Sequence, residues 1–369
     1  MRDIGHIDAR SVPSAGVTVG LAALGWNDDL AAAWAEMGSP GTPGRAARLD
    51  RGWSTVWTAP PAAGTAPLRV RNIGADVTVG DWVVASADGE RVEHVLPRRS
   101  AFVRRRSFEG ARAVSDVLAA NIDVVFLTHS MAVAPNPRRV ERELVLAFDS
   151  GADPVIVLTK ADLVADVEPA RREYLEVSLG VPVVATSGRS EAGIADLRAF
   201  AEGHRTLAFL GASGVGKSTL VNALLGADVQ ATTAVRTGDN RGRHTTVAAE
   251  LLDLPGGGWL IDTPGIRALS LWLSGDGIER AFADVFELMD HCRFRDCKHD
   301  QEPGCAVRAA IADGHLDPDR FASLERLVAE EAALEEEQRE KLRVADKRKG
   351  GRPAPEAADQ TDDGDADDE

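Results

Sequence analysis

The stretch Gly211-Ala-Ser-Gly-Val-Gly-Lys-Ser218 decides the fold, because it fits the phosphate-binding pattern G-x-x-x-x-G-K-[ST]. The apolar run from Leu207 to Leu210 precedes it, and the helical run from Thr219 to Leu225 follows it. A strand, a loop and a helix in this order bring backbone N–H groups at a helix N-terminus around phosphate oxygens. We therefore predict a phosphate-binding loop, with Lys217 reaching the phosphates. It consists of Gly211, Ala212, Ser213, Gly214, Val215, Gly216, Lys217, Ser218 and Thr219.

A second motif lies upstream and concerns the base of a nucleotide. Thr159-Lys-Ala-Asp162 follows the apolar run from Pro154 to Leu158 and differs at one position from N-K-x-D, the guanine-reading signature of GTPases. Asp162 would accept hydrogen bonds from the ring N–H and the exocyclic amine of guanine. Lys160 would lie across the purine face, with Ala161 between the two. The tetrapeptide alone is common on protein surfaces, so its weight comes from its position at the end of a buried-strand pattern.

The neighbouring residues bear on how tightly guanine is read. Ala185-Thr-Ser-Gly188 follows the next apolar run, and we expect a backbone N–H of Thr186 or Ser187 to contact the guanine carbonyl. Thr159 stands where GTPases have Asn. An Asn side chain would link this loop to the phosphate-binding loop through both an amide donor and an acceptor, whereas Thr has only a shorter hydroxyl. The base-reading motif precedes the phosphate-binding motif, the reverse of the usual order. A nucleotide site assembled in this permuted order indicates GTP.

Two downstream motifs contain candidates for binding the nucleotide's magnesium. In Asn240-Arg-Gly-Arg-His-Thr-Thr246 we expect Thr245 or Thr246 to bind Mg²⁺ and to sense the γ-phosphate. In Asp262-Thr-Pro-Gly265, Asp262 would hold the Mg²⁺ water shell together with Ser218, and the Gly265 N–H would meet the γ-phosphate.

The group that activates water is less evident from these motifs. Many GTPases place a Gln just after this glycine, but here Ile266 follows it and no Gln lies nearby. His244 is the side chain of the preceding loop that titrates in a suitable range, so we predict a catalytic role for it. The alternative is a solvated or RNA-facing histidine.

All three cysteines lie in one short window, Cys292, Cys297 and Cys305, with His299 among them. Three thiolates and an imidazole at C-x4-C-x-H-x5-C spacing are typical of tetrahedral zinc. Three thiols beside a surface histidine are the alternative, and His291 is a second candidate imidazole. Four protein ligands leave no open position, so we predict one structural Zn²⁺.

Composition and charge set further limits. The chain has 369 residues, 44% of them hydrophobic, and a formal net charge of −16. The first residues contain no apolar leader and no segment approaches the length of a membrane span, so we expect a cytoplasmic protein. Residues 45–112 nevertheless hold twelve Arg against seven Asp and Glu, a local excess of five positive charges. Residues 350–369 hold eight acids and one Arg, so this tail is expected to be disordered.

The pattern of apolar runs divides the chain into five parts. Residues 1–44 form an extension with a short helix, capped by Asn27 or Asp28 and ended by the Gly/Pro stretch 38–44. Short β-strands in residues 45–110 fit a five-stranded OB-type barrel, although any small β-domain would share this spacing. In residues 111–275 strands alternate with helices, which predicts a doubly wound parallel sheet. Residues 276–349 are helical around the cysteines, and 350–369 form the tail.

Together these motifs resemble the circularly permuted GTPases that depend on the small ribosomal subunit, often called RsgA or YjeQ. The resemblance runs from about Gly25 to Asp317 and includes Val79-Gly-Asp-Trp-Val83 and Val95-Leu-Pro-Arg98, which look like the family's OB-fold. It implies a multidomain α/β protein with an OB-type barrel, a permuted P-loop GTPase domain and a helical zinc-binding domain. It also implies a late assembly factor that docks on the immature small subunit, where contact stimulates GTP hydrolysis and triggers release. Ile266 matches the apolar residue that replaces the usual Gln, and His244 matches the family's switch-loop histidine.

The partners expected on this basis are the small subunit and its rRNA, and the protein is expected to act as a monomer. Phosphate contacts are predicted for a basic set in the barrel region: Arg98, Arg99, Arg104, Arg105 and Arg106. Two rival classes remain. A nucleotide-gated RNA-binding switch with little catalysis is favoured by the absent Gln. A P-loop ATPase or kinase would require Thr159 to abolish guanine selection.

Overall fold

The structure is a computed structural model that describes residues 20–105, 115–178, 180–226, 249–262 and 275–350. Several sequence predictions fall outside these ranges, so the structure does not test them. They concern residues 1–19, the acidic tail from residue 351, Arg106, His244, Thr245, Thr246, Gly265 and Ile266. The backbone of Arg105 is described but its side chain is not.

Helix α2 spans Asp28–Glu36, and Asn27 caps it as predicted. The Asn27 side chain accepts a hydrogen bond from the Leu30 N–H at 3.0 Å, satisfying one of the free donors at the helix start. Leu30 and Trp34 are buried. Trp26, just before the helix, packs edge-on against the Trp82 ring of the barrel at 5.0 Å between centroids.

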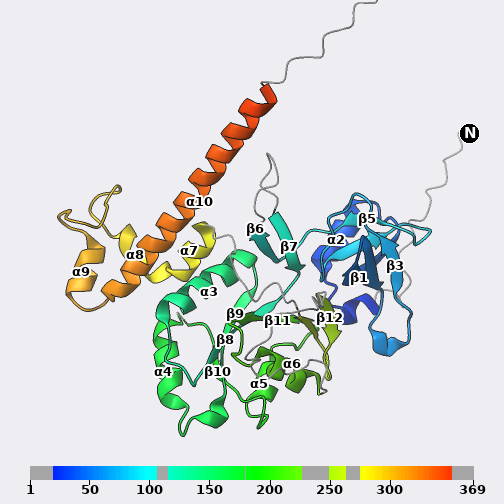
Figure 1. Ribbon diagram of the computed structural model, residues 1–369, viewed down its shortest axis with the longest axis horizontal. Coiled ribbons are helices and arrows are strands. Elements are labelled where there is room, and N and C mark those ends of the chain that lie inside the picture. The colour runs from blue at the N-terminus through cyan, green and yellow to red at the C-terminus, as the bar shows by residue number, and fades with distance from the viewer. Residues whose placement is uncertain (1–19, 106–114, 179, 227–248, 263–274, 351–369) are drawn as a thin grey trace, which may run out of the picture.

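Five strands then form the predicted barrel (Figure 1): β1 (Thr42–Asp50), β2 (Trp53–Trp57), β3 (Leu68–Arg71), β4 (Trp82–Ala85) and β5 (Val92–Val95). The short 3-10 helix η1 (Pro61–Ala63) lies between β2 and β3. Strand β1 pairs with β2 and β4, β2 with β3, and β4 with β5. A parallel bridge between Arg71 and Arg91 joins β3 to the start of β5 and closes the ring. This order, β1-β2-β3-β5-β4, is that of an OB-fold.

Two features of this region differ from the sequence prediction. Strand β1 begins at Thr42, inside the Gly/Pro stretch that we expected to end the extension, and three residues before the expected start of the barrel. Gly44 is required there because a Cβ would lie 2.5 Å from Val56 Cγ1 and 2.8 Å from the Trp57 carbonyl oxygen. Strands β6 (Ala101–Arg105) and β7 (Ser115–Ala120) pair antiparallel, so the division expected at residue 110 runs through a hairpin.

The central sheet is parallel, as predicted, with one antiparallel strand. Its order is β10-β9-β8-β11-β13-β12, formed by β8 (Val124–Ser130), β9 (Asp153–Thr159), β10 (Val183–Ala185), β11 (Thr206–Gly211), β12 (Glu250–Asp253) and β13 (Trp259–Asp262). Strand β12 is antiparallel to β13 and also pairs with β1, at Arg48 and Glu250. The barrel and the central sheet are therefore joined by backbone hydrogen bonds.

Alternate residues of the central strands are buried on opposite faces of the sheet. Val125 and Leu127 pack with helices α3 (Pro137–Ser150) and α4 (Glu168–Val177). Val124 and Phe126 pack with α5 (Ile194–Ala199) and α6 (Lys217–Leu225). Helices on both faces make this a doubly wound sheet, whose ligand loops belong at the carboxyl ends of its strands.

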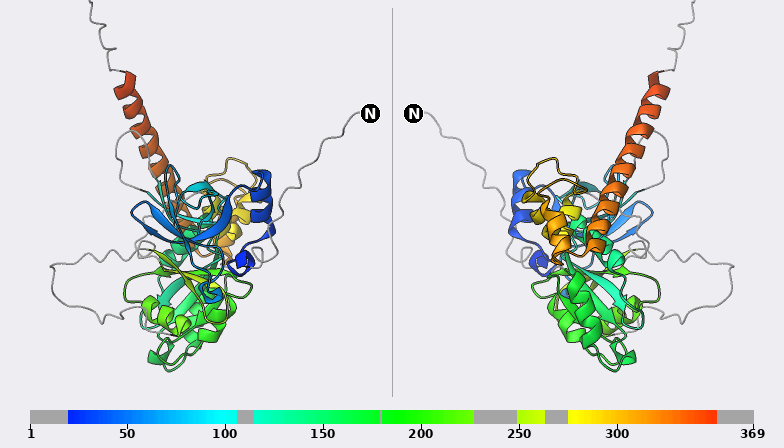
Figure 2. Two further views of the ribbon diagram at one scale, coloured as in Figure 1. Left: turned by 90° about the vertical axis from the view of Figure 1, so that its right-hand side faces the viewer. Right: turned by 90° about the vertical axis from the view of Figure 1, so that its left-hand side faces the viewer.

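The C-terminal part is helical: α7 (Gly275–Ala281), α8 (Ala283–Asp290), α9 (Ala306–Ala312) and α10 (Pro318–Gly350). It docks on α3 through charged pairs. Arg142 of α3 makes two hydrogen bonds to Glu330, at 2.5 and 2.9 Å, and Arg320 contacts the buried Glu141 at 3.2 Å. The far end of α10 projects beyond the rest of the fold (Figure 2). Within the described ranges, no helix has the length and apolar character to cross a lipid bilayer.

Candidate functional site

The predicted phosphate-binding loop connects β11 to α6. Gly211 ends β11 with φ of +148°, and a Cβ there would lie 2.5 Å from the Thr128 carbonyl oxygen, so only glycine fits. Lys217 is buried at the first position of α6, and its ammonium donates to the Gly211 carbonyl at 2.6 Å and to the Ala212 carbonyl. The loop therefore surrounds the Lys217 ammonium and leads directly into a helix N-terminus, where backbone N–H groups can bind phosphate.

Thr159 links this loop to the base-reading motif. Its side chain is 2% exposed, and its hydroxyl lies in hydrogen-bond range of two carbonyl oxygens, those of His129 at 3.1 Å and of Val215 at 2.5 Å. Val215 belongs to the phosphate-binding loop, and the Cα of Gly216 faces Thr159, because a Cβ on Gly216 would lie 3.5 Å from Oγ1. A single buried hydroxyl thus ties the two motifs together, although Thr159 lacks the amide found in other GTPases.

The other residues of the base-reading motif contact the loop that follows β10. Lys160 has φ of +62° and begins a 3-10 turn, η2 (Ala161–Leu163), that turns the chain toward the loop after β10. The Ala161 N–H donates to the Thr186 carbonyl at 3.1 Å. Ser187 is fully buried and donates from Oγ to Asp162 Oδ1 at 2.6 Å, which holds the exposed Asp162 carboxylate in place. The Thr186 hydroxyl is buried without a hydrogen-bond partner in the described structure.

The two predicted magnesium residues lie on neighbouring elements at the carboxyl end of the central sheet. Strands β11 and β13 are parallel neighbours, with Ala208 opposite Ile261. Asp262 therefore ends its strand beside the start of the phosphate-binding loop, and Ser218 lies in the first turn of α6. A carboxylate and a hydroxyl at one edge suit Mg²⁺, which prefers oxygen ligands.

A cleft of about 1390 Å³ adjoins these loops. Residues 212–215 and Lys160 line one side, and His315, Asp317 and Arg320 of the C-terminal part line another. Residues of both nucleotide motifs and of the helical part therefore line one cleft.

The four predicted zinc ligands converge. Their ligand atoms lie within 4.8 Å of one another, and His299 Nδ1 lies 3.6 Å from Cys292 Sγ and 3.5 Å from Cys305 Sγ. Tetrahedral zinc with Zn–S of about 2.3 Å and Zn–N of about 2.0–2.1 Å would set S···N near 3.6 Å and S···S near 3.8 Å. The Cys292–Cys305 sulfur separation is 4.0 Å. The cluster fits zinc, whereas His291 turns away and contacts the Glu287 carbonyl at 2.8 Å.

The arginines predicted to contact RNA already have acidic partners. Arg98 Nε donates to the fully buried Asp81 at 2.7 Å, and Arg99 pairs with Asp123. Arg104 lies 3.5 Å from Asp116 across the β6–β7 hairpin. Asp81 therefore holds Arg98 in place, whereas the Arg99 and Arg104 side chains remain 56% and 43% exposed beside their acidic partners.

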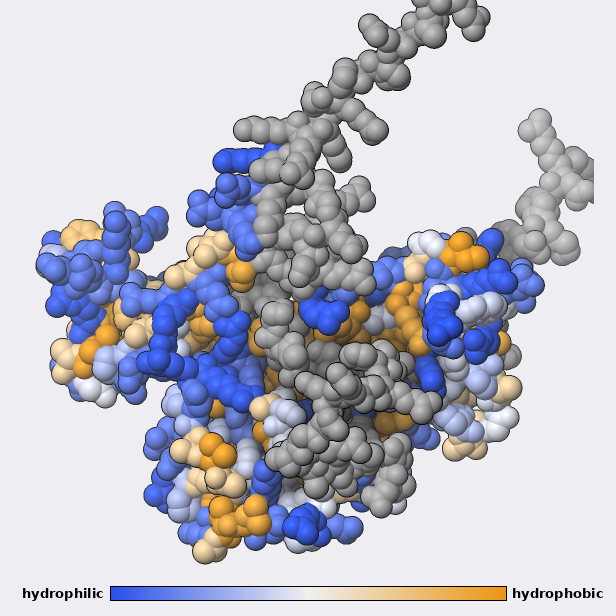
Figure 3. All heavy atoms as spheres, in the orientation of Figure 1, coloured by the Kyte–Doolittle hydropathy of each residue, from blue (hydrophilic) through white to orange (hydrophobic). Residues whose placement is uncertain are grey.

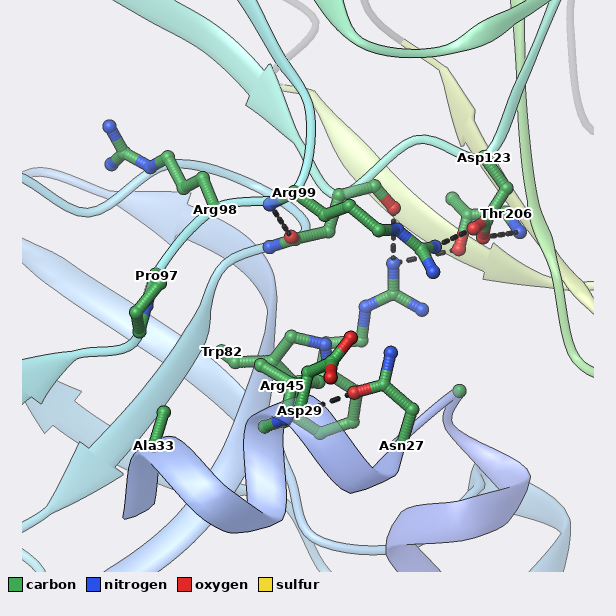
Figure 4. Close-up of a pocket in the computed structure, with 13 residues that line it drawn as sticks. Asn27, Asp29, Ala33, Arg45, Trp82, Pro97, Arg98, Arg99, Asp123 and Thr206 are labelled. Atoms are coloured by element: carbon green, nitrogen blue, oxygen red, sulfur yellow. Dashed lines mark hydrogen bonds and ion pairs between the residues drawn. The ribbon is translucent and has the colours of Figure 1, made fainter. Parts of the chain in front are cut away.

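One residue that the sequence did not suggest stands at the junction of barrel and central sheet. Arg45 is 2% exposed and donates to the Leu24 carbonyl at 2.7 Å, the Asn121 carbonyl at 3.0 Å and the Thr206 hydroxyl at 2.7 Å. Thr206 is the first residue of β11, the strand that leads into the phosphate-binding loop. Figure 4 shows the Arg45 guanidinium between Trp82 and Thr206, beside a pocket of about 230 Å³.

The charge of this arginine is unusual for a buried site. Burial lowers the pKa of the Arg45 guanidinium to about 9, so it still carries its charge at neutral pH. In the described structure no carboxylate oxygen lies within 4.0 Å of its nitrogens, and carbonyl and hydroxyl oxygens satisfy its donors instead. No motif marks such a residue, because its partners lie far away in sequence.

Comparison with known proteins agrees with this geometry. The profile of the family described as RsgA GTPase matches residues 95–272. The Small ribosomal subunit biogenesis GTPase RsgA of Streptomyces coelicolor is 44% identical over 350 residues, covering 89% of this chain and 93% of that protein. The chain belongs to the RsgA GTPase family. The similarly named protein of Streptomyces avermitilis is also 44% identical, over 84% of this chain and 85% of that protein.

Solved structures of this fold include YjeQ from Thermotoga maritima, with a TM-score of 0.56 over 79% of this chain and 98% of that one. A second is YloQ, described as a circularly permuted GTPase, with a TM-score of 0.58 over 79% of this chain and 95% of that one. Both are 24% identical and support the permuted fold. As an RsgA GTPase, the protein hydrolyses GTP to GDP and phosphate and uses Mg²⁺. The permuted order predicted from the two motifs is confirmed.

Proposed function

We propose that this protein acts in late maturation of the small ribosomal subunit, that binding the subunit stimulates its GTP hydrolysis, and that hydrolysis drives its release. The names of the Streptomyces relatives support the first part over most of the chain. The main support for GTP as the nucleotide is the Thr159 hydroxyl. It joins the base-reading loop to the phosphate-binding loop, and these two loops occur along the chain in permuted order.

Guanine would be recognised at the end of β9. Asp162, steadied by Ser187, would accept from the ring N–H and the exocyclic amine, and Lys160 would cover the purine face. Ala161 sets the turn between them. The guanine carbonyl would meet a backbone N–H of Thr186 or Ser187, with the unpartnered Thr186 hydroxyl close by.

The phosphates would lie against residues 211–219. Backbone N–H groups of the loop and the N-terminus of α6 would bind phosphate oxygens. Lys217 would exchange the Gly211 and Ala212 carbonyls for the β- and γ-phosphates. Ser218 and Asp262 would hold Mg²⁺ with Thr245 or Thr246, and the bound ion neutralises charge that develops on the phosphates. Gly265 would contact the γ-phosphate.

Water activation is assigned to His244, since Ile266 offers no polar group at the position of the usual Gln. Docking on the subunit would bring this histidine to the γ-phosphate, which makes turnover low in free protein. This separates the proposal from a passive nucleotide-gated switch, in which docking would not raise turnover.

The helical part would hold one structural Zn²⁺ through Cys292, Cys297, His299 and Cys305. The partner is the small subunit with its rRNA, bound by a monomer in the cytoplasm. Phosphate contacts from Arg98, Arg99, Arg104, Arg105 and Arg106 would add to binding where their ion pairs leave them free.

Sedimentation with purified subunits tests the docking and release steps. We expect the protein to pellet with small subunits in a non-hydrolysable GTP analogue and to leave them in GDP. Equal retention in both nucleotides would contradict release by hydrolysis. Competition of ATP against labelled GTP in the same buffer tests guanine selection, and equal affinity would favour the ATPase alternative.

A further inference from the structure

The pocket beside Arg45, called here the Arg45 pocket, lies where helix α2, the barrel and the central sheet meet. The barrel contributes Arg45 and Trp82 to its wall, and the central sheet contributes Thr206, the first residue of β11. Leu30 and Ala33 of α2 also line it, as Figure 4 shows for Ala33. None of the 13 lining residues belongs to the nucleotide or zinc sites, so the pocket has no role in the chemistry described above.

Arg45 brings a hydrogen-bond donor to this pocket that the described residues do not use. Its Nη2 donates twice, to the Asn121 carbonyl and to the Thr206 hydroxyl. Its Nη1 also has two N–H groups, but among the described residues it has one acceptor, the Leu24 carbonyl at 2.7 Å. A Cβ on Gly25, which lines the pocket, would lie 3.5 Å from Nη1. Because glycine has no side chain, space remains beside this nitrogen for a ligand atom.

The positive charge of Arg45 differs from that of the other two arginines in the pocket. Arg98 pairs with Asp81, and Arg99 pairs with Asp123. Arg45 is buried, and the groups that accept its hydrogen bonds are neutral. A buried charge is costly unless an opposite charge and hydrogen bonds compensate it. A ligand with one negative charge would supply the partner that Arg45 lacks.

The other lining residues favour a small carboxylate with an apolar body. Figure 3 shows hydrophilic side chains over β1 and β3 outside the barrel, whereas the buried apolar side chains of Leu30 and Trp82 line the pocket. Asp29 and Asp123 also line it and would repel a second negative charge, so a carboxylate fits better than a phosphate dianion. The volume of about 230 Å³ is below the roughly 300–1,000 Å³ of pockets for drug-sized ligands, so the ligand must be small.

We propose that the Arg45 pocket binds a small carboxylic acid with an aromatic or branched apolar body. The carboxylate would accept a hydrogen bond from the second Nη1 N–H of Arg45, and the body would pack against Trp82 and α2. Such a ligand would contact the barrel, α2 and the start of β11 at once, so its binding would stabilise the arrangement of these three parts. The proposal does not depend on the ribosomal role or on the identity of the nucleotide.

Fluorine NMR of para-fluorophenylacetate with the full chain tests the proposal. Saturating GDP and Mg²⁺ keep the nucleotide site occupied, so that the probe cannot bind there. We expect saturable binding of one probe per chain. The amide para-fluorophenylacetamide has the same body without the charge, and it should bind about 10- to 150-fold more weakly because it lacks a hydrogen bond between charged groups. Comparing acid with amide tests the role of Arg45 without disturbing the buried hydrogen bonds of its side chain.

Two matched variants of α2 locate the bound probe. Ala33→Phe places a ring in the pocket and should abolish probe binding, together with any rise in Tm that the probe causes in the unaltered protein. Ala32 is exposed and does not line the pocket, so Ala32→Phe should bind the probe like the unaltered protein. Both variants should bind GTP normally, which shows that they fold.

Three results would overturn the proposal. Equal affinity for the acid and the amide would show that Arg45 does not anchor the ligand. Binding of the acid that persists in Ala33→Phe would place the ligand outside the Arg45 pocket. Absence of binding by para-fluorophenylacetate, benzoate and isovalerate at millimolar concentrations would show that the pocket does not take small carboxylates.

Discussion

Replacing Thr159 by Val tests whether one hydroxyl holds the two nucleotide motifs together. Valine has nearly the same shape, so the substitution removes the hydroxyl without leaving a cavity. The single hydroxyl hydrogen, which lies within reach of the Val215 carbonyl at 2.5 Å and the His129 carbonyl at 3.1 Å, is then lost at a site that is 2% exposed. Leaving a buried neutral acceptor unsatisfied costs about 1–3 kcal/mol.

That energy should appear as reduced GTP affinity. Without the hydroxyl, the base-reading loop must be ordered against the phosphate-binding loop when the nucleotide binds. A cost of about 1–3 kcal/mol corresponds to roughly a 5- to 150-fold higher dissociation constant. Titration of a fluorescent GTP analogue measures it directly, with the ATP affinity as a comparison, since the preference for GTP should fall as well.

Two further variants serve as controls for this result. Thr159→Ser keeps the hydroxyl and should stay near the unaltered affinity, and Thr159→Asn restores the residue usual in GTPases and should bind at least as tightly. If Thr159→Val binds GTP as tightly as Thr159→Ser, then the hydrogen bond to Val215 does not organise the site and the reasoning is wrong.

Four other substitutions probe the remaining assignments. Asp162→Asn should weaken GTP binding roughly 10- to 150-fold and shift preference toward xanthine nucleotides, as measured by competition; unchanged affinity would exclude this loop. Lys217→Ala should abolish detectable hydrolysis in a phosphate-release assay with subunits present, because the phosphates lose their cation. Cys297→Ser should lower the zinc content, which metal analysis should give as about one ion per chain in the unaltered protein. It should also reduce the helical circular dichroism signal and retain GTP binding. Unaltered protein that contains no zinc would contradict the site. His244→Ala should leave GTP affinity unchanged but slow subunit-stimulated turnover about 10²- to 10⁴-fold, and a rate equal to that of the unaltered protein would remove His244 from the mechanism.

The parts of the fold that the sequence predicts are those set by local pattern. The phosphate-binding loop needs only β11 and α6, which adjoin it in sequence, and the zinc ligands lie within one short window. Helix α2 begins after the predicted Asn27 cap because capping is a local hydrogen bond. The start of strand β1 is not predicted, because Pro43 and Gly44 are typical of turns. Here the close approach of β2, a tertiary contact, requires the glycine.

The contacts that depend on distant partners could not be predicted. Arg45 and Arg98 look alike in sequence, since both are arginines in a basic region. Their roles are set by Thr206 and Asp81, which the fold brings beside them. The same applies to Trp53, whose neighbours Arg69 and Arg71 become adjacent only through the register of β2 and β3. A basic composition therefore indicates an RNA-binding region, but the partners of each arginine decide which of them are free to bind.

The most direct test of the central claim is the rate of GTP hydrolysis by the full chain, titrated separately with purified small and large ribosomal subunits. We predict slow hydrolysis by the free protein, a saturable rise with small subunits and no rise with large subunits. Equal rates with no subunit and with small subunits, or equal stimulation by both, would contradict the account.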